Sequence, residues 1–186
     1  MNEMENIIGI EKIETGIEGF DMISEGGLPK GRTTLIAGTS GSAKTVFAVQ
    51  FLSEGIIKKE EPGVFITFEE PPDDIRKNVI SLGWDVAKWE QEGKWAFVDA
   101  SPVVGEDHVI AGEYDLGALL ARIEYAVGKI GARRVSMDSI GSIFGRFTDP
   151  GLVRNELFKI AAVVKQMGVT AIITAERTEE YGAIAR

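Results

Sequence analysis

The fold of this chain is decided by the stretch Gly38-Thr39-Ser40-Gly41-Ser42-Ala43-Lys44-Thr45. It follows the apolar run 34–37 and precedes a helical pattern that extends from Val46 to Ile57. A glycine-rich loop between a strand and a helix is typical of phosphate-binding loops, because its backbone N–H groups and the helix N-terminus attract an anion. The pattern G-x-x-x-x-G-K-[ST] is met except at Ala43, where glycine is usual. The stretch therefore predicts a nucleotide site at the start of a helix.

Two side chains of this loop have predicted tasks. We expect Lys44 to reach the β- and γ-phosphates and the Thr45 hydroxyl to ligate Mg²⁺, so that ATP and Mg²⁺ are the implied cofactors. Ala43 is expected to take right-handed helical dihedrals without strain. An ordinary glycine-rich turn that ends in Lys-Thr is the alternative. The predicted nucleotide-binding residues of this segment are Thr39, Ser40, Gly41, Ser42, Ala43, Lys44, Thr45 and Val46.

The composition predicts a cytoplasmic protein without membrane association. The chain of 186 residues is long enough for one domain with a full core, and it has no cysteine for a disulfide or a thiolate metal site. Residues 1–12 lack the apolar block of a secretory signal, and no apolar stretch approaches the ~20 residues of a membrane span. The formal net charge of −9 argues against unassisted binding to nucleic acids. We expect residues 1–9 to form a flexible tail and residues 10–186 to form the domain.

Short apolar runs alternate with helical patterns along the chain. Apolar residues at the i, i+3, i+4 spacing predict helices over 116–130 and 153–167, with Pro150-Gly151 marking the start of the latter. Asp73-Asp74 suits the first turn of another helix, because acidic groups favour the helix N-terminus. The apolar runs are residues 33–37, 64–67, 95–98, 135–138 and 171–174. Since they are apolar on both faces, the pattern predicts an α/β fold with a doubly wound, mainly parallel sheet and helices on both faces.

Two acidic residues follow the second of these runs. In doubly wound sheets, ligands bind beyond the carboxyl ends of the strands, so polar residues there are candidates for chemistry. Glu69 and Glu70 are predicted catalytic residues, because two carboxylates at this edge could position and deprotonate a water that attacks the γ-phosphate. Solvated acids at the start of a loop are the alternative.

Polar residues also mark the other strand ends. The run 135–138 ends in Asp138, a Walker B pattern whose carboxylate holds Mg²⁺ directly or through water, so Thr45 and Asp138 are the predicted metal site. Thr174-Ala175-Glu176-Arg177 ends the last run, where a group that senses the γ-phosphate could lie. Arg133-Arg134 is interpreted as a solvated pair just before a strand.

Several further motifs are more selective than a phosphate loop. They are Gly26-Gly27-Leu28-Pro29, Gly63-Val64-Phe65-Ile66-Thr67-Phe68-Glu69-Glu70, Leu82-Gly83-Trp84-Asp85, Asp99-Ala100-Ser101-Pro102, Ala132-Arg133-Arg134-Val135-Ser136-Met137-Asp138-Ser139 and Glu179-Glu180-Tyr181-Gly182. Together with the phosphate loop they resemble the KaiC family of circadian-clock ATPases, and more narrowly its N-terminal ATPase lobe. The resemblance extends in register from about Ile10 to Arg186.

The resemblance implies a RecA-like fold, ATP bound between subunits of a homohexameric ring, and slow ATP hydrolysis. It implies that Glu69 and Glu70 are the catalytic carboxylate pair and that Ser81 lies close to the nucleotide. The segment 101–114 matches the part of the family that docks the small clock protein KaiB after hydrolysis. A variable surface insertion is the alternative for this segment, since loops tolerate changes in length.

Three departures from the family pattern limit what carries over. Ala43 replaces the more usual glycine. The sequence stops at Arg186, whereas the family's lobe continues through strands whose Lys and Arg reach the neighbouring subunit's ATP. The second lobe, which bears the autophosphorylated Ser/Thr and the kinase activity, has no counterpart here. We therefore expect the chain to be a fragment of a longer protein, and an autokinase activity to belong to that parent protein.

Two other functions are compatible with the same sequence. A DNA-dependent ATPase of the RecA/RadA type would use the same fold to grip single-stranded DNA, which needs a basic channel with stacking aromatics. The net charge of −9 disfavours it. A nucleotide-dependent scaffold would bind ATP to hold a ring together without turnover.

Overall fold

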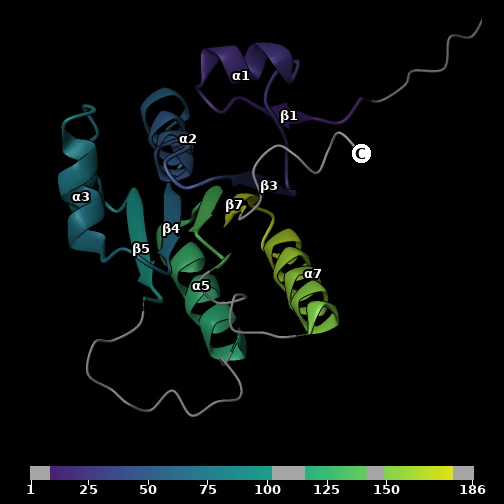
Figure 1. Ribbon diagram of the computed structural model, residues 1–186. Helices are drawn as coiled ribbons and strands as arrows, with labels where there is room; N and C mark the ends of the chain where they lie inside the picture. Colours follow the sequence, from purple (N-terminus) through teal and green to yellow (C-terminus); the bar gives the residue numbers. More distant parts are fainter. Residues whose placement is uncertain (1–8, 102–115, 142–148, 178–186) are drawn as a thin grey trace, which may run out of the picture.

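The fold is built around a five-stranded parallel sheet with the strand order β3-β7-β6-β4-β5 (Figure 1). The computed structural model of the chain describes residues 9–101, 116–141 and 149–177. The strands are β3 (Thr33–Gly38), β4 (Gly63–Thr67), β5 (Trp95–Asp99), β6 (Arg134–Asp138) and β7 (Thr170–Glu176). Each predicted apolar run forms one of them, so the predicted parallel α/β sheet is confirmed. A short antiparallel pair, β1 (Lys12–Ile13) and β2 (Leu28–Pro29), precedes the sheet.

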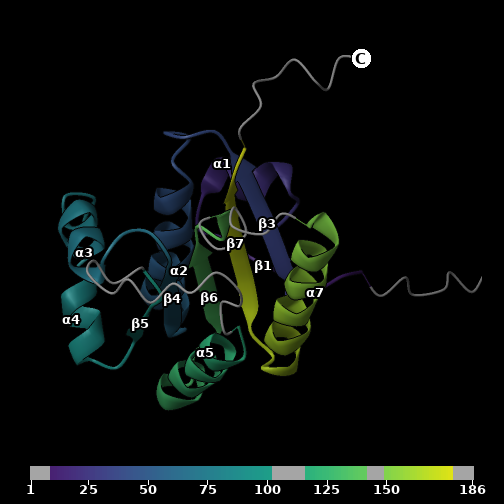
Figure 2. The ribbon, with the colours of Figure 1, turned by 60° about the horizontal axis from the view of Figure 1, so that its bottom comes forward.

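Helices cover both faces of the sheet (Figures 1 and 2). They are α1 (Glu18–Ile23), α2 (Lys44–Lys59), α3 (Pro72–Ile80), α4 (Val86–Gln91), α5 (Leu116–Ile130) and α7 (Pro150–Gln166). One core lies between the sheet and α5 and α7, and the other between the sheet and α2, α3 and α4. No helix within the described parts of the chain is both long and apolar enough to span a membrane.

The central strand β4 illustrates why the apolar runs show no alternation. Val64 and Ile66 pack into the core beneath α5 and α7, whereas Phe65 packs into the core beneath α2 and α3. All residues of β4 and β6 are buried, because each side of a parallel sheet is covered by helices. Both faces of these strands must therefore be apolar or have satisfied polar groups.

The predicted helix starts are confirmed, and side chains stabilise several of them. Helix α7 begins at Pro150, and the carboxylate of Asp149 accepts a hydrogen bond from the Gly151 N–H at 2.8 Å. Helix α3 carries Asp73 and Asp74 in its first turn, where acidic groups interact favourably with the helix dipole. The Asp85 carboxylate caps α4 in the same way as Asp149 caps α7, by accepting from the Lys88 N–H at 3.0 Å.

Alternate residues of β6 hydrogen-bond to α2 at intervals of one helical turn. Arg134 donates through Nη1 to the Phe51 carbonyl at 3.0 Å. Ser136 donates through Oγ to the Ala48 carbonyl at 2.9 Å. The Thr45 hydroxyl donates to Asp138 Oδ2 at 2.7 Å. Every second residue of a strand lies on the same face, and so does every third or fourth residue of a helix. The three bonds therefore join one face of β6 to one face of α2, and they fix the position of α2 along the sheet. We call them the β6–α2 ladder.

Arg134 corrects one sequence-based interpretation. Arg133 is exposed, as expected of a solvated residue, but the side chain of Arg134 is 2% exposed. Its Nε donates to Glu61 Oε2 at 2.7 Å, and its Nη1 also donates to the Glu14 carbonyl at 2.9 Å. The guanidinium lies over the Phe51 ring at 4.8 Å. Burial is tolerated because these partners satisfy the charge and the donors.

Candidate nucleotide-binding site

The glycine-rich loop lies at the carboxyl edge of the sheet, between the end of β3 and the start of α2. The strand register pairs Gly38 with Glu176, Met137 with Ile173, and Thr67 with Asp138. The carboxyl ends of β3, β7, β6 and β4 therefore meet at one edge. This is where ligands bind in doubly wound sheets, so the geometry agrees with the place predicted for the nucleotide.

The loop is tightly curled, and two of its glycines suit its shape for different reasons. A Cβ atom at Gly38 would lie 2.3 Å from Ser42 Oγ and 3.2 Å from Ser42 Cβ, so a side chain there would force the Ser42 side chain to move. Gly41 has a φ of +75°, a conformation that residues with a side chain rarely adopt. The Ser42 N–H donates to the Thr39 carbonyl at 3.2 Å and closes the turn. Ser40 lies exposed between them.

Ala43 does not have the expected conformation. Its φ of 62° and ψ of 26° place it in the left-handed region, as the residue that caps the start of α2. The expectation of right-handed helical dihedrals is therefore wrong. A capping residue stands outside the helix and need not share its dihedrals. For a residue with a Cβ, this conformation costs roughly 1–2 kcal/mol, which explains why glycine is usual at this position.

The N-terminus of α2 offers N–H groups to an anion. None of the described side chains caps this helix of 16 residues, and its first turn carries no acidic residue. The first N–H groups of a helix have no intrahelical acceptor, and the helix dipole adds positive potential there. Lys44 begins the helix, and its Nζ donates to the Thr39 carbonyl at 2.8 Å, so its charge lies over the loop. Val46 follows in the same turn and is 39% exposed. These donors suit the phosphate groups of a nucleotide.

The two residues predicted to hold Mg²⁺ are in direct contact. The hydroxyl of Thr45 lies 2.7 Å from Asp138 Oδ2, and Asp138 is 9% exposed at the end of β6. The other carboxylate oxygen, Oδ1, accepts a hydrogen bond from the Thr174 hydroxyl. A hydroxyl and a carboxylate are oxygen ligands of the kind that Mg²⁺ prefers. The donor set therefore fits the metal, although its binding there stays a prediction.

Glu69 and Glu70 follow β4 after one residue, Phe68, whose N–H donates to the carbonyl of Asp138 at the end of β6. Both side chains are exposed. The Thr67 hydroxyl donates to the Glu70 carbonyl, and Asn78 Nδ2 donates to Glu70 Oε2 at 3.4 Å. Within the described residues, no hydrogen bond or ion pair holds the Glu69 carboxylate. The structure thus brings both carboxylates to the predicted edge, and it leaves Glu69 free to turn towards a ligand.

The other predicted residues lie apart from the loop or outside the described chain. Ser81 follows the last residue of α3, and its hydroxyl donates to the Asn78 carbonyl at 3.1 Å. Among the hydrogen bonds of the described residues, none joins Ser81 to the glycine-rich loop. Of the predicted docking segment 101–114, only Ser101 is described, and its backbone N–H donates to Asp99 Oδ1 at 2.9 Å. The roles of Ser81 and this segment stay predictions.

Sequence reasoning missed the contact of Thr174 with Asp138. It treated the last strand end as a possible sensor of the γ-phosphate, whereas the Thr174 side chain is fully buried and bonded to the carboxylate. The signal that could have found this contact is the register of the two parallel strands. Ile173 pairs with Met137, so the next residues of the two strands, Thr174 and Asp138, lie side by side. A polar residue in an otherwise apolar strand then indicates a buried hydrogen bond.

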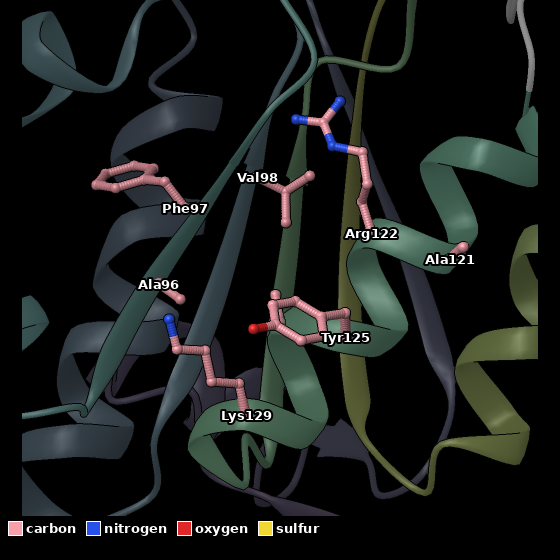
Figure 3. Close-up of a pocket in the computed structure, with 8 residues that line it drawn as sticks. Ala96, Phe97, Val98, Ala121, Arg122, Tyr125 and Lys129 are labelled. Carbon is pink, nitrogen blue, oxygen red and sulfur yellow. The ribbon is translucent and has the colours of Figure 1, made fainter.

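The hollow drawn in Figure 3 is a different feature of the molecule. It lies between the edge strand β5 and α5, and its volume is about 420 Å³. Arg122, Tyr125 and Lys129 reach over it from α5. It contains no residue of the loop and none of the strand-end carboxylates, so we do not assign the nucleotide to it. An open loop that wraps around a phosphate forms no deep cavity by itself.

The fold is that of a RecA-like P-loop ATPase domain. It has a phosphate loop between β3 and α2, an aspartate at the end of β6, and a parallel sheet covered on both faces. A family model described as "ATPase: KaiC" matches residues 13–186. The chain belongs to the KaiC family.

Relatives with curated names support this assignment. The chain is 62% identical over 178 residues to "Circadian clock protein KaiC3" of Synechocystis sp., covering 96% of this chain and 35% of the relative. It is 55% identical over 177 residues to "Circadian clock oscillator protein KaiC" of Synechococcus elongatus, covering 95% and 34%. It is 52% identical over 184 residues to the protein of that name from Parathermosynechococcus lividus, covering 99% and 34%. The chain thus spans about a third of the length of these relatives.

Proposed function

We propose that this chain binds MgATP at the glycine-rich loop and hydrolyses ATP as part of a KaiC-like circadian clock protein. The observation that carries the proposal is the contact of Thr45 with Asp138 beside the uncapped N-terminus of α2. It places a charged group, a hydroxyl and free backbone donors at one edge of the sheet. Phosphoryl transfer needs mainly such positioning and charge stabilisation, so little other chemistry is required of the protein.

Each residue has a defined task in this reaction. The first-turn N–H groups of α2 and the Lys44 ammonium hold the β- and γ-phosphates. The Thr45 hydroxyl donates its hydrogen bond to Asp138 Oδ2, so a lone pair of its oxygen remains available to ligate a metal ion. Bound Mg²⁺ supplies positive charge that neutralises the phosphate oxygens. Glu69 and Glu70 orient the attacking water and accept its proton.

The whole protein's assembly and partners also belong to this proposal. By its similarity to KaiC proteins, we infer a homohexameric ring with ATP between subunits, and a KaiB-like clock protein that docks on segment 101–114. In this arrangement Ser81 lies close to the nucleotide. The clock role implies a cytoplasmic location. Any Ser/Thr autokinase activity resides in another part of the parent protein.

Calorimetry of MgATP binding tests the nucleotide site. Lys44→Ala should weaken binding by about 1.5–3 kcal/mol, roughly ten- to a hundredfold in Kd, because it removes the charge paired with the phosphates. Lys159→Ala is the control, since Lys159 is 64% exposed and pairs only with Glu156 on α7 among the described residues. A folded wild-type chain that binds no MgATP, or equal binding by Lys44→Ala, would show that the site is assigned wrongly. Binding without turnover in the full-length protein would favour the scaffold instead.

A further inference from the structure

Thr174 is a fully buried residue of β7 whose hydroxyl lies against the carboxylate of Asp138. An ionised carboxylate can only accept, so the Thr174 hydroxyl is the donor to Oδ1. The same residue holds the chain after β6 through its backbone, because the Ile140 N–H donates to the Thr174 carbonyl at 3.0 Å. Thr174 therefore contacts both the side chain of Asp138 and the segment that follows it.

The two oxygens of Asp138 have separate partners. Oδ2 accepts from Thr45, which belongs to α2, and Oδ1 accepts from Thr174, which belongs to β7. Asp138 is only 9% exposed, so an oxygen that loses its donor has little access to water. A buried acceptor without a partner is unfavourable, and the carboxylate relieves this by rotating towards another donor or towards solvent. Such a rotation moves Oδ2 away from Thr45.

We propose that Thr174 is a positioning residue, which sets the orientation of the Asp138 carboxylate and so keeps Oδ2 on Thr45 where a metal ion is held. The orientation of the Asp138 carboxylate by Thr174 does not require a bound nucleotide. Its consequence for metal binding rests on the function proposed above. Outer partners of this kind orient a metal ligand, and their loss usually weakens metal binding roughly 10–100-fold. The neutral alternative is a threonine that merely satisfies its hydroxyl with the nearest acceptor and leaves Asp138 in place when it is removed.

A matched pair of substitutions separates these cases. Thr174→Val keeps the shape of the side chain and removes the donor, whereas Thr174→Ser keeps the donor and removes a methyl group. Thr170→Val is the control, because Thr170 is also buried on β7 but lies at the opposite end of the strand, where its hydroxyl accepts from the Gly31 N–H at 2.9 Å. Should the valine variant not fold, Thr174→Ala removes the same donor without a bulky replacement.

Three measurements on the full chain test the proposal. Crystal structures without nucleotide should show the bond between Thr45 and Asp138 in the wild type, in Thr174→Ser and in Thr170→Val, and a rotated carboxylate in Thr174→Val. Electron paramagnetic resonance titration of Mn²⁺ into the complex with a non-hydrolysable ATP analogue should show a Mn²⁺ Kd raised roughly 10–100-fold in Thr174→Val only. Turnover should fall in kcat more than it changes in KM, and Thr174→Ser should restore it.

The outcomes are distinguishable. An unmoved Asp138 in Thr174→Val overturns the proposal, whatever the nucleotide does. A rotated carboxylate with unchanged Mn²⁺ affinity overturns its metal part. A rotated carboxylate in a protein whose wild type binds no Mn²⁺–nucleotide complex supports the positioning role and shows that the proposed function is wrong.

Discussion

Ala43 occupies a backbone conformation that glycine adopts readily and that alanine adopts only at a cost. The sequence departs from the usual phosphate-loop pattern at this residue, and the structure shows that the alanine takes a strained backbone conformation there. The loop closes around this position through the bond from Ser42 to Thr39, and the helix begins directly after it. The departure should therefore affect stability more than the ability to bind phosphate.

We expect Ala43→Gly to raise the free energy of unfolding by up to about 1.5 kcal/mol. Relief of the left-handed strain is worth roughly 1–2 kcal/mol, and the extra flexibility of glycine costs roughly 0.5–1 kcal/mol. Urea denaturation measures the difference. Ala162→Gly, at an exposed interior position of α7, is the control and should destabilise by about 1 kcal/mol. A clear loss of stability in Ala43→Gly would show that the alanine side chain makes a contact that outweighs the strain.

Glu69 and Glu70 allow chemistry to be separated from binding. Replacing both with Gln removes the proton acceptor while keeping size and polarity, so turnover of the full-length protein should fall roughly 10²–10⁴-fold with unchanged MgATP affinity. The control is the neighbouring acidic pair in the first turn of α3, changed to Asp73→Asn and Asp74→Asn. Single-turnover hydrolysis is the measurement. Equal turnover in the Gln variant would move the base elsewhere, with Asp138 as the next candidate.

At the scale of elements, the β6–α2 ladder determines where the phosphate loop sits. Arg134 and Ser136 donate to carbonyls of α2, and Asp138 accepts from Thr45 at its start, so the helix cannot slide along the strand without breaking all three bonds. Thr45 is both the last contact of the ladder and a predicted metal ligand. The position of the site is thus coupled to buried contacts at the far end of the same strand.

Gly55 tests how tightly the Arg134 end of the ladder is packed, because the Arg134 side chain crosses it. A Cβ atom at Gly55 would lie 2.5 Å from Arg134 Cδ. Gly55→Ala should therefore destabilise by about 1–3 kcal/mol, the usual cost of overpacking, although alanine normally favours a helix. Gly128→Ala in α5 is the matched control: its Cβ would meet nothing within 4 Å, so it should stabilise by roughly 0.5–1 kcal/mol. Thermal denaturation compares them. Stabilisation by both substitutions would mean that Arg134 moves aside freely.

At the scale of the whole molecule, two parts of the chain have different proposed tasks. The carboxyl edge of the sheet carries the loop, Thr45, Asp138 and the two glutamates, whereas the proposed docking segment 101–114 follows β5 in the sequence. A substitution in one should leave the other intact if the nucleotide and a protein partner use separate surfaces.

Replacing Val103–Ala111 with a Gly-Ser linker tests that separation in the full-length protein. Capture of a KaiB-like partner should be lost, because the apolar side chains of the segment are removed, while MgATP affinity should stay unchanged. Pull-down with purified partner and calorimetry provide the two readouts. A linker of equal length that retains Val109 and Ile110 is the control. Undiminished capture would make the segment a simple connector, and loss of folding would make it part of the core.

The local sequence determined the strands, the main helix starts and the strand-end residues of the site. Apolar runs locate buried strands because both faces of a parallel sheet are covered, and Asp149, Pro150 and the acids of α3 mark helix starts by hydrogen bonding and charge. The glycine pattern located the phosphate loop for the same reason, since its backbone shape depends on the residues of the loop itself. These features need no knowledge of distant neighbours.

Tertiary structure alone decided which polar groups are buried and what they contact. The sequence predicted a solvated Arg134, whereas in the folded protein its side chain is bonded to Glu61, Glu14 and Phe51. The sequence showed Thr174 only as a residue at the end of a strand, whereas the register of β6 and β7 brings its hydroxyl against the Asp138 carboxylate. Such contacts join residues far apart in the chain, and their energy depends on geometry and desolvation that no local pattern encodes. The sequence could therefore indicate a candidate site, whereas the orientation of its carboxylate depends on strands and a helix that meet only in the folded protein.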